Sequence, residues 1–332
     1  MKAKVLLFGL LSSCVATPAP SATPAARAKA PVEDAERIVQ AAASELEHSY
    51  VFADKGHEFA EYLRGRQREG KYAGEETLVL ARHLTEDLRA KSHDGHLWIK
   101  YSEKTLPDED AHSKAEMEKR DIEKYFGPRV NYGFNKVEHL PDNIGLLEMS
   151  VFAPLDVGAH AASAAMTLLA TSDALVIDLR NNGGGDGEMV AFLAAYLFDK
   201  GPQTMSSTYW RAENKTMPGL TPAYVPGRRF GSTKPVYVLT SKRTFSAAEN
   251  FTYDLQALKR VVVVGERSGG GAHPNEMKKL TPHFAMSVAI GRSLNPITNA
   301  DWEGTGVTPD VPVPAEQALE KALELARAAK PR

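Results

Sequence analysis

The second half of the chain alternates short apolar runs with helix-like stretches, and this alternation limits the possible folds more than any other feature. Runs with the length and composition of strands stand at 144–152, 174–180, 235–241 and 261–266. Stretches with helical periodicity separate them, at 158–171, 187–198 and 246–259. Strands that alternate with helices build a parallel sheet with crossover helices. The pattern therefore predicts an α/β domain whose functional residues lie in the loops that follow the strands.

The rest of the chain divides by pattern into separate parts. Residues 31–101 repeat apolar side chains at spacings of three and four, which predicts a small helical unit ending in a strand that begins at His96. A polar interval at 102–125 predicts a linker, and the α/β domain takes up 126–332. With 43% hydrophobic and 25% charged residues, the composition suits a globular protein with a sizeable core. The formal net charge of −2 gives no electrostatic reason to expect a nucleic-acid partner.

The first 30 residues have the features of an export signal followed by a tether. Lys2 and Lys4 precede an apolar run that is too short to span a bilayer. The only cysteine, Cys14, ends the sequence LSSC, which resembles the bacterial lipobox, and a Pro- and Ala-rich stretch follows it. We therefore expect an exported protein, periplasmic or at the cell surface, that a lipid on Cys14 anchors to the outer membrane. A plainly cleaved signal is the alternative, and a single cysteine allows no intramolecular disulfide.

One serine stands where a strand is predicted to pass into a helix. Ser246 and Glu249 have the S-x-x-E spacing of a capping box, in which each side chain satisfies an unpaired amide at the helix start. The same position suits a nucleophile, because the helix dipole and the amide of Ala247 would stabilise an oxyanion beside it. The local sequence is compatible with both interpretations, which need not exclude each other.

Two further loops carry candidate functional residues. The glycines at 183–185 follow a predicted strand, where they let backbone amides approach a ligand. Phosphate binding is an alternative for this loop, but the sequence lacks the G-K-[ST] of a phosphate-binding loop. His96 is a candidate base, and with His93 and Asp94 it could also form one corner of a metal site. No further ligand cluster has convincing spacing, so we predict neither a metal nor a cofactor.

Five motifs, taken in their order, resemble those of a known enzyme family. They are DGH (94–96), DLRNNGGG (178–185), TFSAAE (244–249), VVGERSGGGAH (263–273) and WEGTGVTPD (302–310). This set is similar to that of the tricorn-like and tail-specific, or C-terminal processing, serine peptidases, a family that includes the interphotoreceptor retinoid-binding protein modules. The resemblance implies a crotonase- or ClpP-like α/β catalytic domain with a small N-terminal helical domain.

The resemblance also implies roles for individual residues. Ser246 matches the nucleophile, His96 the general base of the tricorn-like branch, and Glu303 the acidic residue that supports the base. These groups are chemically sufficient, because a neutral histidine can accept the serine proton and a carboxylate can stabilise the resulting imidazolium. The family arrangement implies that the amides of Ala247 and Gly184 donate hydrogen bonds to the oxyanion.

Three departures from the family narrow what the resemblance implies. The tail-specific branch has a lysine base in the loop that here contains Gly271, so a Ser–Lys mechanism is not expected. The interval between the helical unit and the sheet is too short for the PDZ domain of that branch, so this chain resembles the branch without one. Gly95 stands where tricorn has a serine before its base histidine. A direct contact, a water or another hydroxyl could therefore connect Glu303 to the base.

The remaining candidates concern substrate binding. A long insertion at 207–235, which contains Pro and Gly, is expected to form a wall or lid of the cleft. Tyr209 and Trp210 lie in it as candidate substrate-binding residues, and His273 could face the same cleft. Gly183 is a further candidate, either for substrate binding or as an oxyanion donor in place of Gly184.

We therefore predict a serine endopeptidase that hydrolyses a peptide or protein substrate through an acyl-enzyme. One alternative is a non-catalytic module that binds apolar ligands, as the retinoid-binding relatives do. Another is an esterase that uses the same residues. If His96 is not the base, Lys242 and His273 are the next candidates.

Overall fold

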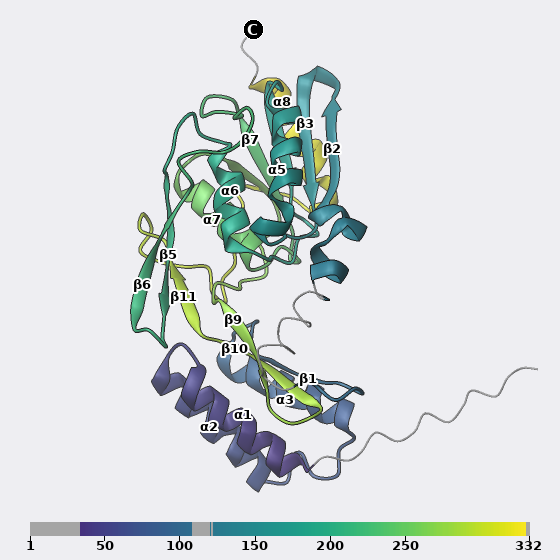
Figure 1. The fold of residues 1–332 in the computed structure, drawn as a ribbon, viewed down its shortest axis with the longest axis vertical. Helices are drawn as coiled ribbons and strands as arrows, with labels where there is room; N and C mark the ends of the chain where they lie inside the picture. Colours follow the sequence, from purple (N-terminus) through teal and green to yellow (C-terminus); the bar gives the residue numbers. More distant parts are fainter. Residues whose placement is uncertain (1–33, 108–119, 121, 330–332) are drawn as a thin grey trace, which may run out of the picture. The chain divides into compact units, whose positions relative to one another are not determined.

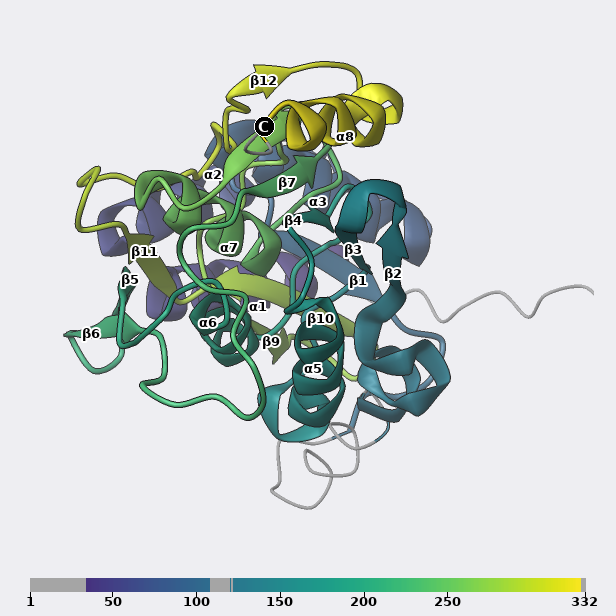
Figure 2. The same cartoon turned by 90° about the horizontal axis from the view of Figure 1, so that it is seen from above.

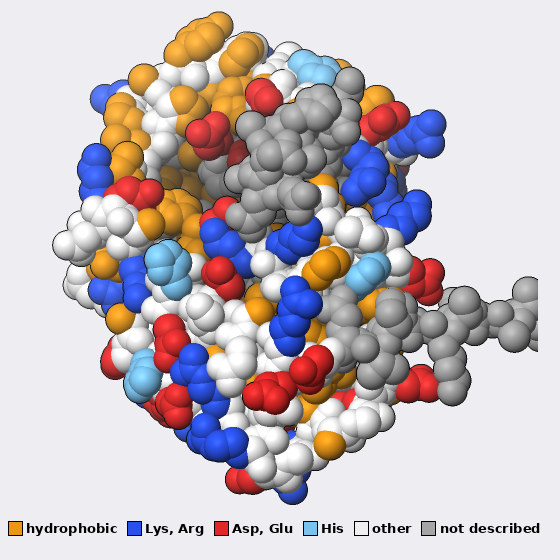
Figure 3. Space-filling view, turned by 60° about the horizontal axis from the view of Figure 1, so that its bottom comes forward, with side chains coloured by type: hydrophobic (Ala, Val, Ile, Leu, Met, Phe, Trp, Pro, Cys, Tyr) orange, Lys and Arg blue, Asp and Glu red, His pale blue; other side chains and the backbone are white. Residues whose placement is uncertain are grey.

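The computed structural model describes residues 34–107, 120 and 122–329, which belong to one compact unit (Figure 1). The expected signal, tether and lipidation site at Cys14 lie outside the described residues, as do residues 108–119 and 121 of the predicted linker. Within the described part of the chain, no helix is long and apolar enough to cross a bilayer. Figure 3 shows acidic and basic side chains interspersed on one face, in keeping with the small net charge.

The N-terminal part consists of helices that pack on a small sheet. The helices are α1 (Ala35–Ser49), α2 (Ala53–Arg68) and α3 (Thr77–Ser92). The antiparallel sheet has the order β1 (Trp98–Tyr101), β10 (Phe284–Ala289) and β9 (Asn275–Lys279). Apolar side chains of the three helices, β1 and β10 form one buried cluster. Segments from opposite ends of the sequence therefore share the core of the helical unit.

A six-stranded sheet forms the centre of the α/β domain, in the order β12-β8-β7-β4-β3-β2. Its strands are β2 (Phe134–Leu140), β3 (Ile144–Met149), β4 (Ala174–Asp178), β7 (Val236–Thr240), β8 (Val262–Gly265) and β12 (Val311–Pro312). Neighbouring strands are parallel except for β2, which pairs antiparallel with β3. The four apolar runs of the sequence are β3, β4, β7 and β8, so the predicted α/β class with a small helical N-terminal region is confirmed.

Helices cover both faces of this sheet (Figure 2). On one face, α5 (Leu155–Leu169), α6 (Gly187–Ala195) and α7 (Ala247–Ala257) share a buried cluster with one set of strand residues. On the other face, α8 (Ala318–Ala328) packs against the alternate set. Because β4 and β7 are parallel neighbours, the loops that lead from them into α6 and α7 meet at one edge of the sheet.

A third, antiparallel sheet has the order β11 (Gly291–Leu294), β5 (Thr204–Trp210) and β6 (Lys215–Leu220). The first part of the insertion predicted at 207–235 as a wall or lid of the cleft belongs to the β5–β6 hairpin. The pairing tolerates Pro218 because β6 is the edge strand of this sheet. Short helical turns complete the described structure at Ile122–Phe126, Pro128–Gly133, Pro141–Asn143 and Ala315–Gln317.

Candidate active site

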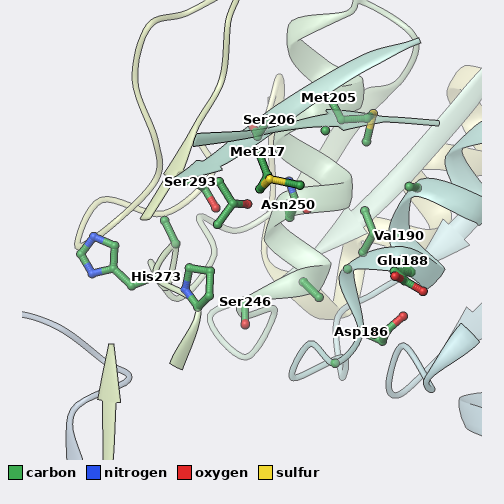
Figure 4. Close-up of a pocket in the computed structure, with 18 of the residues that line it drawn as sticks. Asp186, Glu188, Val190, Met205, Ser206, Met217, Ser246, Asn250, His273 and Ser293 are labelled. Atoms are coloured by element: carbon green, nitrogen blue, oxygen red, sulfur yellow. The ribbon is translucent and has the colours of Figure 1, made fainter. Parts of the chain in front are cut away.

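Ser246 occupies the tight turn between β7 and α7. Its backbone has φ 53° and ψ −121°, a conformation that an L-residue adopts only under strain. Ser246 and Glu249 have the arrangement of the predicted capping box, in which the Ser246 amide donates to Glu249 Oε2 at 2.9 Å. The Glu249 amide also donates to the Ser246 carbonyl. Ser246 lines a cavity of about 580 Å³ (Figure 4).

Glu249 ties the turn of Ser246 to the glycine-rich loop after β8. Its Oε2 accepts hydrogen bonds from the amides of Ser246 at 2.9 Å and Gly271 at 2.7 Å. Its Oε1 accepts from the Ser268 hydroxyl at 2.5 Å and the Gly270 amide at 2.7 Å. Burial raises the pKa of Glu249, although these four donors oppose the rise. The sequence indicated this residue only as a helix cap, because its other partners come from a later loop.

The oxyanion donors differ in part from the prediction. Among the described residues, none accepts a hydrogen bond from the amide of Ala247, which lies in the first turn of α7 and faces the cavity. The amide of Gly184 is engaged, because it donates to Asn182 Oδ1 at 2.9 Å. The role of Gly184 as an oxyanion donor stays a prediction, and it would require this hydrogen bond to Asn182 to be exchanged. The amide of Gly185 makes no hydrogen bond within the described chain, and Gly185 lines the cavity with Ser246.

Gly184 packs against Ser246, and Gly183 lines a different cavity. A Cβ added to Gly184 would lie 2.8 Å from Ser246 Cβ, so only glycine allows this close approach of the two loops. Gly183 does not line the cavity of Ser246. It lines a second cavity of about 480 Å³, which also includes Gly185. The two cavities share Gly185 as a lining residue.

His96 lies beside Phe245 and Gly271 and is not a lining residue of the cavity. The residue is 5% exposed, its ring centroid lies 4.7 Å from that of Phe245, and its buried Nδ1 has no hydrogen-bond partner among the described residues. Burial lowers its pKa to about 4, against the attraction of Asp94, so the ring is neutral near pH 7. A Cβ at Gly271 would stand 2.7 Å from His96 Cε1. The imidazole thus fills the space beside the position where the tail-specific branch has its lysine.

Glu303 lies close to His96 but makes no hydrogen bond with it. Its Oε2 accepts from the amides of Ala272 at 2.5 Å and His273 at 3.1 Å, while its buried Oε1 has no partner in the part of the chain that the structure describes. Asp94, His96 and Glu303 each place one polar atom within 4.8 Å of the others. Burial and the charge of Asp94 raise the pKa of Glu303 to about 7. These three ligand types at this separation could also hold a divalent cation.

His273 is held by the N-terminal part of the protein. Its Nδ1 lies 2.9 Å from Asp94 Oδ2, which also accepts a hydrogen bond from the Tyr50 hydroxyl at 3.1 Å. Burial alone would lower the pKa of His273, but the Asp94 hydrogen bond and the charge of Glu303 outweigh it and raise the pKa. His273 lines the edge of the cavity, yet Figure 4 shows its ring pointing away from Ser246. This orientation suits an anchor between the two parts of the protein better than a base.

The other candidates from the sequence, Trp210, Tyr209 and Lys242, lie in different places relative to the cavity. Trp210 lines the cavity, whereas Tyr209, its neighbour in β5, faces the opposite side and packs against the N-terminal cluster. The Tyr209 hydroxyl donates to Asn214 Oδ1 at 3.1 Å. The prediction of Tyr209 as a residue of the cavity wall is therefore wrong, because side chains alternate along a strand. Lys242 is exposed and does not line the cavity, so it lacks the position of a base.

Comparison with protein families agrees with this arrangement. The model of peptidase family S41 matches residues 143–313, and a model of the N-terminal domain of peptidase S41 in eukaryotic IRBP matches residues 32–135. The first match alone covers more than half of the 332 residues. The chain therefore belongs to peptidase family S41, and the predicted membership of this serine peptidase family is confirmed.

Curated proteins with detectable similarity include enzymes of chloroplasts. The C-terminal processing peptidase of Tetradesmus obliquus is 30% identical over 143 residues, which cover 43% of this chain and 29% of that protein. Carboxyl-terminal-processing peptidase 1 of Arabidopsis thaliana is 26% identical over 181 residues, which cover 54% of this chain and 36% of that protein. The matched part of the chain thus spans about a third of the length of these relatives.

Solved structures show the same fold along most of the chain. A candidate peptidase from Parabacteroides merdae has a TM-score of 0.60 at 19% identity, covering 90% of this chain and 100% of that one. A lipoprotein from Streptococcus agalactiae has a TM-score of 0.58 at 16% identity, covering 90% of this chain and 98% of that one. At such low identity, the likeness shows the fold alone and does not identify the chemistry of the site.

Proposed function

We propose that this protein is a serine endopeptidase in which Ser246 is the nucleophile. The observation that carries the proposal is the strained backbone of this residue at a strand-to-helix turn, in the wall of a cavity. Strain of this kind is kept where the surrounding structure gains a function from it.

The mechanism that we propose takes His96 as the base, whose ring packs against Phe245, the residue before Ser246. His96 is neutral and accepts the proton as Ser246 Oγ attacks the carbonyl carbon of the substrate. The negative oxygen that forms receives hydrogen bonds from the amides of Ala247 and Gly185, each worth about 3 kcal/mol of the barrier. The imidazolium then gives its proton to the leaving amine. Water, activated by His96, hydrolyses the acyl-enzyme and frees the serine.

Glu303 would act in this mechanism by stabilising the imidazolium. The unpartnered Nδ1 of His96 and Oε1 of Glu303 belong to one group of polar side chains, and no direct bond closes the gap between these residues. A water molecule between them would satisfy both buried atoms. We propose this water as the replacement for the hydroxyl that Gly95 does not supply.

Cleavage within a chain is supported by two cavities that share Gly185, one of the proposed oxyanion donors. The cavity of about 580 Å³ includes Ser246, and the cavity of about 480 Å³ includes Gly183. An extended peptide that occupied both cavities would pass the proposed oxyanion site, as hydrolysis inside a polypeptide requires.

A fluorophosphonate tests the proposed nucleophile directly. The reagent should modify Ser246 in the folded protein, and Ser246→Ala should abolish both labelling and the cleavage of an unfolded protein such as casein. Ser207→Ala is the matched control, because Ser207 lies on the other face of the β5–β6 hairpin and bonds the Leu294 carbonyl. Labelling of another serine, or unchanged cleavage by Ser246→Ala, would rule out this assignment.

We further propose that the protein is exported and anchored by a lipid on Cys14. The lipobox resemblance and the Pro- and Ala-rich stretch after it support this location. One structural neighbour is named as a lipoprotein, which agrees with the proposal. Expression in a bacterial host, followed by fractionation and mass spectrometry of the mature N-terminus, tests it. An N-terminus downstream of Cys14 would show an ordinary cleaved signal instead.

A further inference from the structure

The cavity beside Ser246 has walls from three parts of the fold. The first turns of α6 and α7 form one side, and the β5–β6 hairpin with β11 forms the other (Figure 4). Met205 and Met217 reach in from the hairpin, and Val190 reaches in from α6. With about 580 Å³, the cavity is larger than a single side chain needs. It lies directly beside the hydroxyl that the proposed reaction uses.

Apolar side chains form part of the cavity wall, and one of them, Met217, can change its conformation. Met205 is 4% exposed and Val190 is 1% exposed, so both are fixed in the core. Met217 is 45% exposed and stands at the open side, on the edge strand β6. Methionine side chains are flexible and polarizable, which lets them pack around an apolar group of variable shape. An apolar side chain that enters here would replace water on Met217.

The charged side chains of the cavity wall act against anionic groups. Asp186 and Glu188 line the side formed by α6, and Glu188 is exposed. Among the described residues of the wall, none is a lysine or an arginine, and His273 is already bonded to Asp94. A carboxylate of the substrate would therefore meet like charges without a cationic partner. This applies to an acidic side chain and to a free C-terminal carboxylate alike.

A buried carboxylate holds the polar part of the wall in place. Asp254 of α7 is 0% exposed and accepts hydrogen bonds from the Ser206 amide at 2.9 Å and hydroxyl at 2.5 Å. It also accepts from the side-chain amides of Asn250 at 2.9 Å and Asn295 at 2.7 Å. These bonds tie β5 and the segment after β11 to the helix that begins at Ser246. The cavity is thus fixed relative to the nucleophile before any substrate binds.

We infer that this cavity is a specificity pocket for a long apolar side chain, such as methionine or leucine, of a residue next to the scissile bond. The inference rests on the proposed function and adds the substrate class: polypeptides with internal apolar residues, cleaved without recognition of a C-terminal carboxylate. Binding energy gained in the pocket would position the carbonyl beside Ser246.

A set of internally quenched peptides tests the inference. The peptides share one sequence blocked at both ends and differ at a single position, which carries methionine, alanine, glutamine or glutamate. Mass spectrometry identifies the bond that is cut. We expect kcat/KM to be at least about 10-fold higher for methionine than for alanine, and lower for glutamate than for glutamine. Equal rates for the four peptides, or a preference for glutamate, would overturn the inference.

Two neighbouring substitutions on β6 give the second measurement. Met217→Ala should lower kcat/KM for the methionine peptide about 10-fold and leave the alanine peptide within about 2-fold. Thr216→Ala is the matched control, because Thr216 is exposed, pairs with Tyr209 and faces away from the cavity. An equal loss on both peptides, or the same loss in Thr216→Ala, would remove Met217 from the pocket.

Labelling separates this test from the proposed function. A small fluorophosphonate does not need the pocket, so it should label Ser246 at the same rate in the wild type and in Met217→Ala. If Ser246 is labelled and the peptides are cut without side-chain preference, the pocket inference fails alone. If Ser246 is not labelled and no peptide is cut, the proposed function fails, and the pocket inference falls with it.

Discussion

The strain at Ser246 leads to a stability experiment that needs no substrate. Ser246→Ala and Ser246→Gly both remove the hydroxyl and differ only in Cβ, the atom that makes φ 53° with ψ −121° unfavourable. Any difference in their free energies of unfolding therefore measures the backbone conformation rather than the lost chemistry. We expect the glycine variant to be the more stable of the two, which is the reverse of the usual order in a folded protein.

The size of the difference follows from two opposing contributions. An L-residue held in a sparsely populated region costs about 1–3 kcal/mol, which glycine at this position avoids. Glycine in turn loses more backbone entropy on folding, which costs it about 0.4–1 kcal/mol relative to alanine. We therefore expect Ser246→Gly to exceed Ser246→Ala by about 1–2 kcal/mol.

Urea denaturation of both variants at pH 8, followed by circular dichroism, measures the difference. Glu324 provides the control, because it is an exposed residue inside α8 with ordinary helical geometry. There Glu324→Ala should be more stable than Glu324→Gly by about 1 kcal/mol. If alanine were also the more stable residue at position 246, the turn would not be strained, and the main support for a specialised Ser246 would be lost.

The other expectations concern the groups around the serine. His96→Ala should lower kcat/KM by about 10²–10⁴, as loss of a general base does. The pKa of His96 lies near 4 in the folded protein and near 6.5 when unfolded, so its contribution to stability is complete above pH 6.5 and is lost as the pH falls toward 4. His96→Gln should therefore remove about 3 kcal/mol of the acid destabilisation measured with urea between pH 7 and pH 4. The pKa of Glu303 is about 7, so activity that needs its carboxylate should rise as the pH rises through 7. Glu303→Gln should abolish that inflection in the pH profile of kcat/KM. An inflection that persisted in this variant would belong to another group. Glu249→Gln should lower the free energy of unfolding measured with urea by about 2–4 kcal/mol and slow fluorophosphonate labelling. Four donors bond the two carboxylate oxygens of Glu249, and a glutamine side chain offers them only one oxygen.

Local patterns in the sequence determined the strands of the parallel sheet and the place of Ser246. Buried parallel strands give continuous apolar runs, and a crossover helix has its own period, so both are visible without knowledge of distant contacts. The turn from β7 into α7 follows from the same local pattern. The motifs added the identity of the family, since their order along the chain does not depend on their arrangement in space.

The tertiary structure decided which of the nearby groups can act. Gly184 and Gly185 are equivalent in the sequence, but the side chain of Asn182 occupies the first amide and leaves the second. Tyr209 and Trp210 are adjacent aromatic residues, and only the pairing of β5 with its neighbours shows which of them faces the cavity. Burial, direction and hydrogen-bond partners depend on segments far apart in the sequence, so no local pattern contains them.

Dependence on distant segments also explains why the sequence alone did not determine the charges and roles of the acidic and histidine side chains. The low pKa of His96 and the high pKa of Glu303 both come from burial between the N-terminal helices and the loops after β8 and β11. His273 was a candidate base in the sequence, and it became an anchor because Asp94 lies within 2.9 Å of it. The sequence by itself determined which residue types are present at the site. Their charges and roles were decided only when the fold removed water from around them, because the free energy of an ionised group depends on its surroundings.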